Sequence, residues 1–96
     1  MSMYPRAAVI LGFPATGKAL QDDRFEDDLI FDVYNQPFFG RVIITIDDQS
    51  YPTPMDSINA PKWTYDELHA LKDKLCESYP EYSDEKIIKW IIFQYD

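Results

Sequence analysis

The fold class is decided by the stretch AAVILGF, residues 7–13, which is almost wholly apolar. A short apolar run ended by Pro14 and Gly17 is typical of a buried β-strand. Two further segments, residues 29–34 and 41–46, carry apolar side chains at every second position, as a strand with one buried face does. We therefore expect a small antiparallel sheet of three or four strands.

The second and third segments are expected to form a hairpin, because NQPFFG at residues 35–40 supplies turn residues between them. Phe38 and Phe39 would then lie at the hairpin tip. They either fold back onto the sheet or stay exposed as an apolar anchor for a partner. We expect folding back, which is the commoner outcome for large aromatic side chains, and keep both residues as candidates for partner binding.

The C-terminal third is expected to contain two helices. The sequence TYDE, residues 64–67, is a capping box that predicts a helix start, and Pro80 predicts its end. One side of this helix carries an apolar stripe: Tyr65, Leu68, Leu71, Leu75 and Tyr79. Residues 86–95 follow a second start signal, SDE, and are expected to form another helix, although their β-branched and aromatic residues also fit a strand.

These patterns together predict an α+β fold. The sheet of three or four strands would have the two C-terminal helices packed on one face. At 96 residues, the chain is expected to form a single domain, residues 1–96.

Charge is the strongest compositional signal. The chain carries 17 acidic and 9 basic side chains, a formal net charge of −8 at pH 7. Such a chain repels nucleic-acid phosphates, so direct nucleic-acid binding is not expected, but it attracts basic protein surfaces. Repulsion among neighbouring acids predicts a solvated loop or a short helix at residues 14–28. This segment holds five carboxylates: Asp22, Asp23, Glu26, Asp27 and Asp28.

The chain offers little for catalysis or metal binding. Its single cysteine, Cys76, forms no internal disulfide, and two helical turns separate it from the single histidine, His69, which is too far for a catalytic pair. Asp32, Asp47 and Asp48 are candidates for a cation site of hard oxygen ligands, but acids at a strand end are more often solvated. We therefore expect no metal and no cofactor.

No apolar run reaches the length of a membrane span, and the N-terminal residues do not resemble a signal peptide. We therefore expect a cytoplasmic protein without membrane contact.

One motif indicates a different function. The sequence GFPATGK, residues 12–18, has the G-x-x-x-x-G-K spacing of a phosphate-binding loop, in which Gly12, Gly17 and Lys18 would hold nucleotide phosphates. Ala19 stands where the motif needs a hydroxyl for Mg²⁺. The expected hairpin also differs from the βαβ crossover of nucleotide-binding sheets. Nucleotide binding is therefore kept as an alternative.

The leading hypothesis is a small acidic non-enzymatic binding protein that docks on a basic surface of a partner protein, such as a nucleic-acid enzyme. Inhibitors and antidotes of the phage anti-defence or toxin-immunity type have this character. The carboxylates of residues 22–28 would engage lysine and arginine, and Phe38 and Phe39 would supply apolar contacts. A third hypothesis is a homo-oligomeric structural component, such as a homodimer, because residues 87–95 carry surplus apolar surface.

Overall fold

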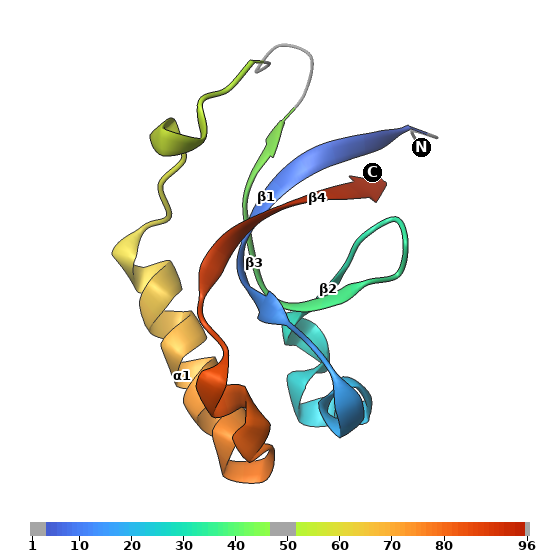
Figure 1. Ribbon diagram of the computed structural model, residues 1–96, viewed down its shortest axis with the longest axis vertical. Coiled ribbons are helices and arrows are strands. Elements are labelled where there is room, and N and C mark those ends of the chain that lie inside the picture. Colours follow the sequence, from blue (N-terminus) through green and yellow to red (C-terminus); the bar gives the residue numbers. More distant parts are fainter. Residues whose placement is uncertain (1–3, 47–51, 96) are drawn as a thin grey trace.

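Four antiparallel strands form one sheet in the order β2-β3-β1-β4 (Figure 1). The structure is a computed structural model that describes residues 4–46 and 52–95. Its strands are β1 (Pro5–Pro14), β2 (Leu29–Phe31), β3 (Pro37–Ile46) and β4 (Ile88–Tyr95). The α+β class and the antiparallel sheet are confirmed, and β2 and β3 form the expected hairpin.

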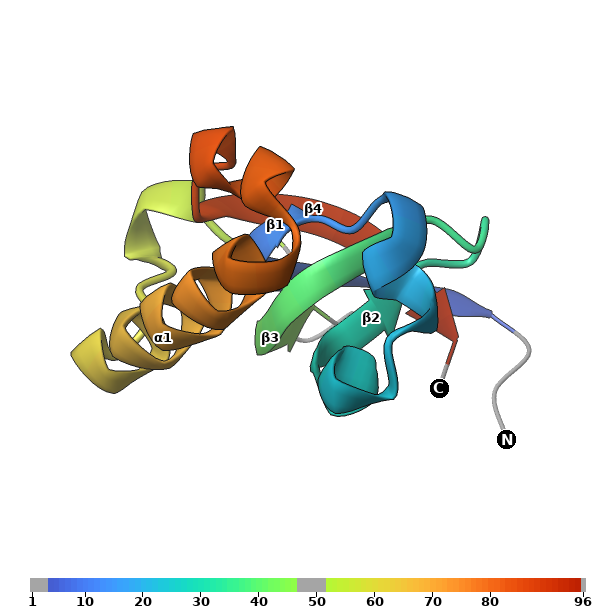
Figure 2. The same cartoon turned by 90° about the horizontal axis from the view of Figure 1, so that it is seen from below.

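The described residues include one α-helix and four short 3-10 helices. In the view of Figure 2, α1 and the last 3-10 helix lie to the left of β3, and the first two 3-10 helices lie to its right. The α-helix is α1 (Lys62–Ser78), and the 3-10 helices are η1 (Gly17–Gln21), η2 (Asp23–Asp28), η3 (Met55–Ser57) and η4 (Pro80–Asp84). The acidic segment is therefore folded into two consecutive short helices, η1 and η2.

The sheet is strongly curved, and two glycines permit the curvature (Figure 1). Gly12 of β1 pairs with Gly40 of β3, and a Cβ added at either position would collide with a backbone carbonyl oxygen of the opposite strand. Without those side chains, the two strands approach closely and the sheet bends into a half barrel.

The turn between β2 and β3 reaches across to the far strand. The Val33 backbone N–H donates to the Phe93 carbonyl oxygen of β4 at 2.8 Å. The Asp32 carboxylate shapes this turn by accepting the backbone N–H groups of Tyr34 and Gln36, both at 2.8 Å. Asn35, with φ of 60°, completes it. These contacts end β2 at Phe31, before the expected strand end at residue 34.

Each face of the curved sheet has its own core. The convex face packs against α1, η1, η2 and η4 through ten buried residues of the described chain: Leu11, Phe13, Ala15, Ala19, Phe25, Phe39, Leu68, Leu71, Leu75 and Tyr82. The concave face holds a smaller core of Ala8, Ile10 and Ile92. Trp90 and Phe38 close this smaller core, with ring centroids 5.3 Å apart, although their strands are not neighbours in the sheet.

The prediction of a second C-terminal helix is wrong. Residues 88–95 form strand β4, which pairs with residues 5–12 of β1, from Gly12↔Ile88 to Pro5↔Tyr95. Alternate side chains of β4 enter the concave core, as Trp90 and Ile92 do, so apolar residues on both sides of the segment suit a strand. The start signal at residues 83–85 instead lies at the end of η4.

The first C-terminal helix is confirmed, but its start differs from the expected one. Helix α1 begins at Lys62 after Pro61, so Thr64 lies inside the helix, where its N–H donates to the Pro61 carbonyl oxygen at 3.0 Å. The expected capping box at Thr64 is therefore not formed. The apolar stripe of the helix packs into the convex core as expected, and the helix ends just before Pro80.

Candidate functional site

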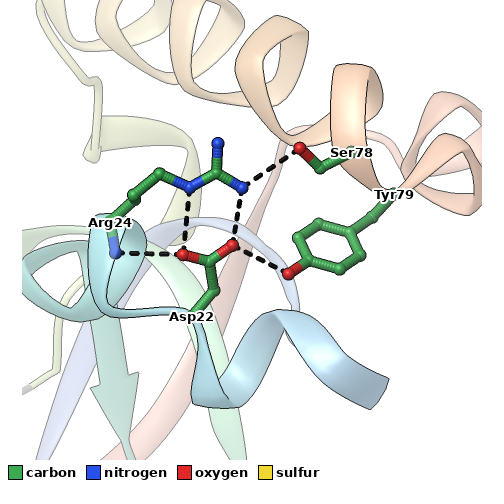
Figure 3. Close-up of polar contacts among 4 residues, drawn as sticks. All are labelled: Asp22, Arg24, Ser78 and Tyr79. Atoms are coloured by element: carbon green, nitrogen blue, oxygen red, sulfur yellow. Dashed lines mark hydrogen bonds and ion pairs between the residues drawn. The ribbon is translucent and has the colours of Figure 1, made fainter.

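The acidic segment is anchored by its first carboxylate. Asp22 precedes η2 and accepts the Arg24 backbone N–H at 3.1 Å, so it caps the helix (Figure 3). The Arg24 guanidinium donates to both oxygens of the same carboxylate, at 3.1 Å from Nε and 2.7 Å from Nη2. The Tyr79 hydroxyl donates to it as well, at 2.8 Å. The Asp22 carboxylate is therefore engaged in hydrogen bonds within the chain.

These contacts fix the protonation of the cluster. The Arg24 hydrogen bonds, and then that of Tyr79, hold the pKa of Asp22 well below its usual value of 3.8. The same carboxylate raises the pKa of Arg24 and, together with burial, the pKa of Tyr79. Asp22 is thus ionised and Tyr79 is a neutral donor at pH 7. Arg24 Nη2 also donates to Ser78 Oγ at 3.1 Å, which ties η2 to the end of α1 (Figure 3).

An aromatic anchor lies beneath the acidic residues. Phe25 of η2 is buried, with its ring centroid 6.3 Å from that of Phe39 and 6.5 Å from that of Tyr79, both in edge-on arrangements. The Arg24 guanidinium carbon lies 5.1 Å from the Phe25 ring centroid. Because its middle is buried and its start is ion-paired, η2 presents its remaining side chains from a fixed backbone.

The end of the acidic segment is also tied down. Arg41 of β3 forms ion pairs with Asp28, at 2.8 Å, and with Glu67 of α1, at 3.4 Å. Arg41 thus joins the last residue of η2 to α1, whereas Asp22 lies at the start of η2. Asp28 is therefore a structural residue as well.

Three of the five candidate carboxylates are not held by contacts of this kind: Asp23, Glu26 and Asp27. All three are exposed, and within residues 4–46 and 52–95 no hydrogen bond or ion pair occupies them. The structure thus divides the five candidate acids into two that hold η2 in place and three that η2 displays.

An apolar groove adjoins two of these carboxylates. A hollow of about 260 Å³ between η1, η2 and β2 is lined by Leu20, Leu29 and Phe31, with Asp23 and Glu26 among the polar lining. Phe31 is 51% exposed. Phe31 was not expected at the surface, because the alternating pattern of residues 29–34 predicts that its side chain lies on a buried face. The one signal for its exposure was Asp32 beside a turn, which shortens the strand.

Phe38 and Phe39, the candidate apolar anchors for a partner, do not face outward. Phe39 is fully buried in the convex core, and Phe38 packs against Trp90 in the concave core. Both belong to β3 rather than to the hairpin tip. The prediction that they fold back is therefore confirmed, and the Phe39 side chain is not exposed in this structure.

The glycine-rich segment does not have the geometry of a phosphate-binding loop. Gly12 lies inside β1, paired on both sides, and Gly17 (φ 65°) begins the five-residue η1. Between them, the Ala15 N–H donates to the Pro37 carbonyl oxygen at 3.0 Å, and the Thr16 N–H donates to the Tyr82 hydroxyl at 2.8 Å. These N–H groups are therefore not free to surround a phosphate.

The other candidate residues that the structure describes are not assembled into a site. Cys76 is half-buried beside the convex core, as expected, and His69 is exposed. Asp32 is used in its turn, and Asp47 and Asp48 lie outside the described residues. Within the described ranges, no three His, Cys, Asp or Glu residues gather as metal ligands. No helix in the same ranges is long and apolar enough to cross a membrane.

Comparison of the chain with protein-family models, with curated proteins and with solved structures finds no match. Any function assigned to this molecule therefore rests on its own geometry and charge.

Proposed function

We propose that this molecule is a small acidic non-enzymatic binding protein that docks on a basic surface of a partner protein. It would act as an inhibitor or antidote of the phage anti-defence or toxin-immunity type. Nucleic-acid enzymes are one class of partner with such a basic surface. The observation that carries the proposal is the display of Asp23, Glu26 and Asp27 from an anchored helix, with none of them paired in the described chain.

Anchoring matters because binding normally costs free energy for ordering the interface. Here Asp22, Phe25 and Asp28 have already ordered the η2 backbone through contacts inside the protein. Fixed carboxylates lose less conformational freedom on binding than carboxylates on a mobile loop. The net charge of −8 adds long-range attraction to a basic surface and favours fast association.

The test is capture of a partner by the full chain from a lysate of its source cell or that cell's host. We expect a stoichiometric partner that is released by rising salt. The triple variant Asp23→Asn/Glu26→Gln/Asp27→Asn should lose about ten-fold or more in affinity, because exposed charge pairs each contribute up to about 1 kcal/mol.

The matched control removes the same charge elsewhere. Asp73→Asn/Glu81→Gln/Asp84→Asn changes three exposed acids of α1 and η4 and should change the affinity by less than about two-fold. Equal losses in the two variants would show that net charge alone drives capture, and an unaltered affinity in the η2 variant would refute the proposal.

A second candidate, self-association, is favoured by one observation. Ile91, Phe93 and Tyr95 lie on the same side of β4 and are 54%, 49% and 60% exposed. Such a row on an edge strand favours contact with another copy of the chain. Sedimentation at high protein concentration tests this candidate, and a monomer throughout would exclude it.

A further inference from the structure

The groove beside the free carboxylates combines an apolar and an acidic lining. Its apolar lining comes from η1 and from β2, through Leu20, Leu29 and Phe31. Its polar lining includes Asp22, Asp23 and Glu26 of the acidic segment. An occupant must therefore bring both apolar surface and positive charge.

Of the three carboxylates that line the groove, two are not held by contacts within the protein. The Asp22 carboxylate is held by Arg24 and Tyr79, and its side chain is 13% exposed. Asp23 and Glu26 are exposed, and the described residues leave both carboxylates without an ion pair. The half-exposed Phe31 ring adds an aromatic surface to the same hollow.

Arginine fits this combination better than lysine does. Its planar guanidinium is weakly hydrated, stacks on aromatic rings and donates in a fork that matches carboxylates, and its aliphatic stem covers apolar surface. The same chain already contains such an arrangement, because Arg24 lies over the Phe25 ring and donates to both oxygens of Asp22. The hollow of about 260 Å³ leaves room for one such side chain.

We propose that the groove lined by Leu20, Leu29 and Phe31 receives an arginine side chain of the partner, with Asp23 and Glu26 accepting its guanidinium N–H groups. This inference rests on the proposed function and sharpens it. The protein would recognise arginine side chains of its partner in particular, and not positive charge in general.

The experiment measures binding of two probes, hexa-arginine and hexa-lysine peptides, to the full chain by titration calorimetry at low salt. Wild-type protein should bind the arginine peptide about three-fold or more tightly than the lysine peptide. Phe31→Ala should weaken arginine binding about two- to five-fold, the range of a lost cation–π contact, and should leave lysine binding nearly unchanged. Asp23→Asn/Glu26→Gln should weaken both.

Two controls match these variants. Phe93→Ala removes a ring of similar exposure, 49% against 51% for Phe31, outside the groove. Asp73→Asn/Glu81→Gln removes the same charge outside it. Both controls should retain the arginine preference. Melting curves check that every variant is folded.

The outcomes separate the two proposals. Equal binding of the two peptides by wild-type protein, weakened by Asp23→Asn/Glu26→Gln, would overturn the arginine groove and leave the acidic docking surface standing. Binding of neither peptide, or equal weakening by the control variants, would overturn both.

Discussion

The two faces of the sheet are closed in different ways. On the convex face, side chains from α1, η1, η2 and η4 cover the strands and bury ten residues together. On the concave face, the described residues form a smaller buried core of Ala8, Ile10 and Ile92. Its cover comes from the sheet itself, because the curvature brings Trp90 of β4 against Phe38 of β3. The convex core thus depends on packing between distant elements, whereas the concave core depends on backbone shape.

This difference assigns the candidate site to one face. Helix η2 is anchored through Phe25 into the convex core and through Asp22 to the residue after α1. Changes in the convex core should therefore disturb the displayed carboxylates, while moderate changes in the concave core should leave them in place.

The largest loss of stability is expected on substitution of Gly12, because the curvature that shapes both faces of the sheet depends on this position. Gly12→Ala places a methyl group against the Phe39 carbonyl oxygen, so β1 and β3 must separate. We expect a loss of more than about 4 kcal/mol in the free energy of unfolding, measured by urea titration. Gly17→Ala is the control: no atom crowds its Cβ, so its positive φ alone should cost about 1 kcal/mol. Similar losses at both positions would contradict this account of the curvature.

Two adjacent phenylalanines compare the faces directly. Phe39→Ala opens a cavity in the convex core and should cost about 3–5 kcal/mol of unfolding free energy. Phe38→Ala, at a half-buried position of the concave core, should cost about 1–2 kcal/mol. Amide exchange or NMR shifts in η2 should change in the first variant and not in the second. The reverse order of the two losses would overturn the comparison.

The smallest effect concerns Asp22, whose carboxylate accepts hydrogen bonds from Arg24 at the start of η2 and from Tyr79 after α1. The folded pKa of Asp22 is lowered, so its contribution to stability is complete above the usual pKa of 3.8 and is lost as the pH falls toward the lower folded pKa. The melting temperature of Asp22→Asn should therefore fall less than that of wild type between about pH 5 and about pH 2. Asp27→Asn, which breaks no ion pair in the described structure, should follow the wild-type pH dependence.

The features that local sequence patterns predicted correctly are those that depend on residues close together in the sequence. The apolar run at residues 7–13, the hairpin and the stripe of α1 are each specified within a few residues of sequence, and each is present. Strand β4 was missed because its residues are apolar on both sides, which suits a buried helix and a covered strand equally well. The choice depends on pairing with β1, which lies at the other end of the sequence.

The site was predictable in composition but not in detail. The acid density at residues 22–28 pointed to η2. Which carboxylates are free depends on Tyr79, which is 57 positions from Asp22 in the chain, and on Arg41 from β3. Partners at such separations leave no periodic signal. Phe31 belongs to the site for a similar reason, since the turn built by Asp32 sets where its strand ends.

The pairing of β1 with β4 also constrains the order in which the molecule can fold. Pro5 is paired with Tyr95, so β1, one of the two inner strands of the sheet, lacks one neighbour until residues 88–95 have been synthesised. A growing chain can form the β2–β3 hairpin early, but closing the concave core requires a contact of long sequence separation, which is slow to form. Until then, one side of β1 remains an open edge, so nascent chains that end before Ile88 are the species most exposed to aggregation and proteolysis.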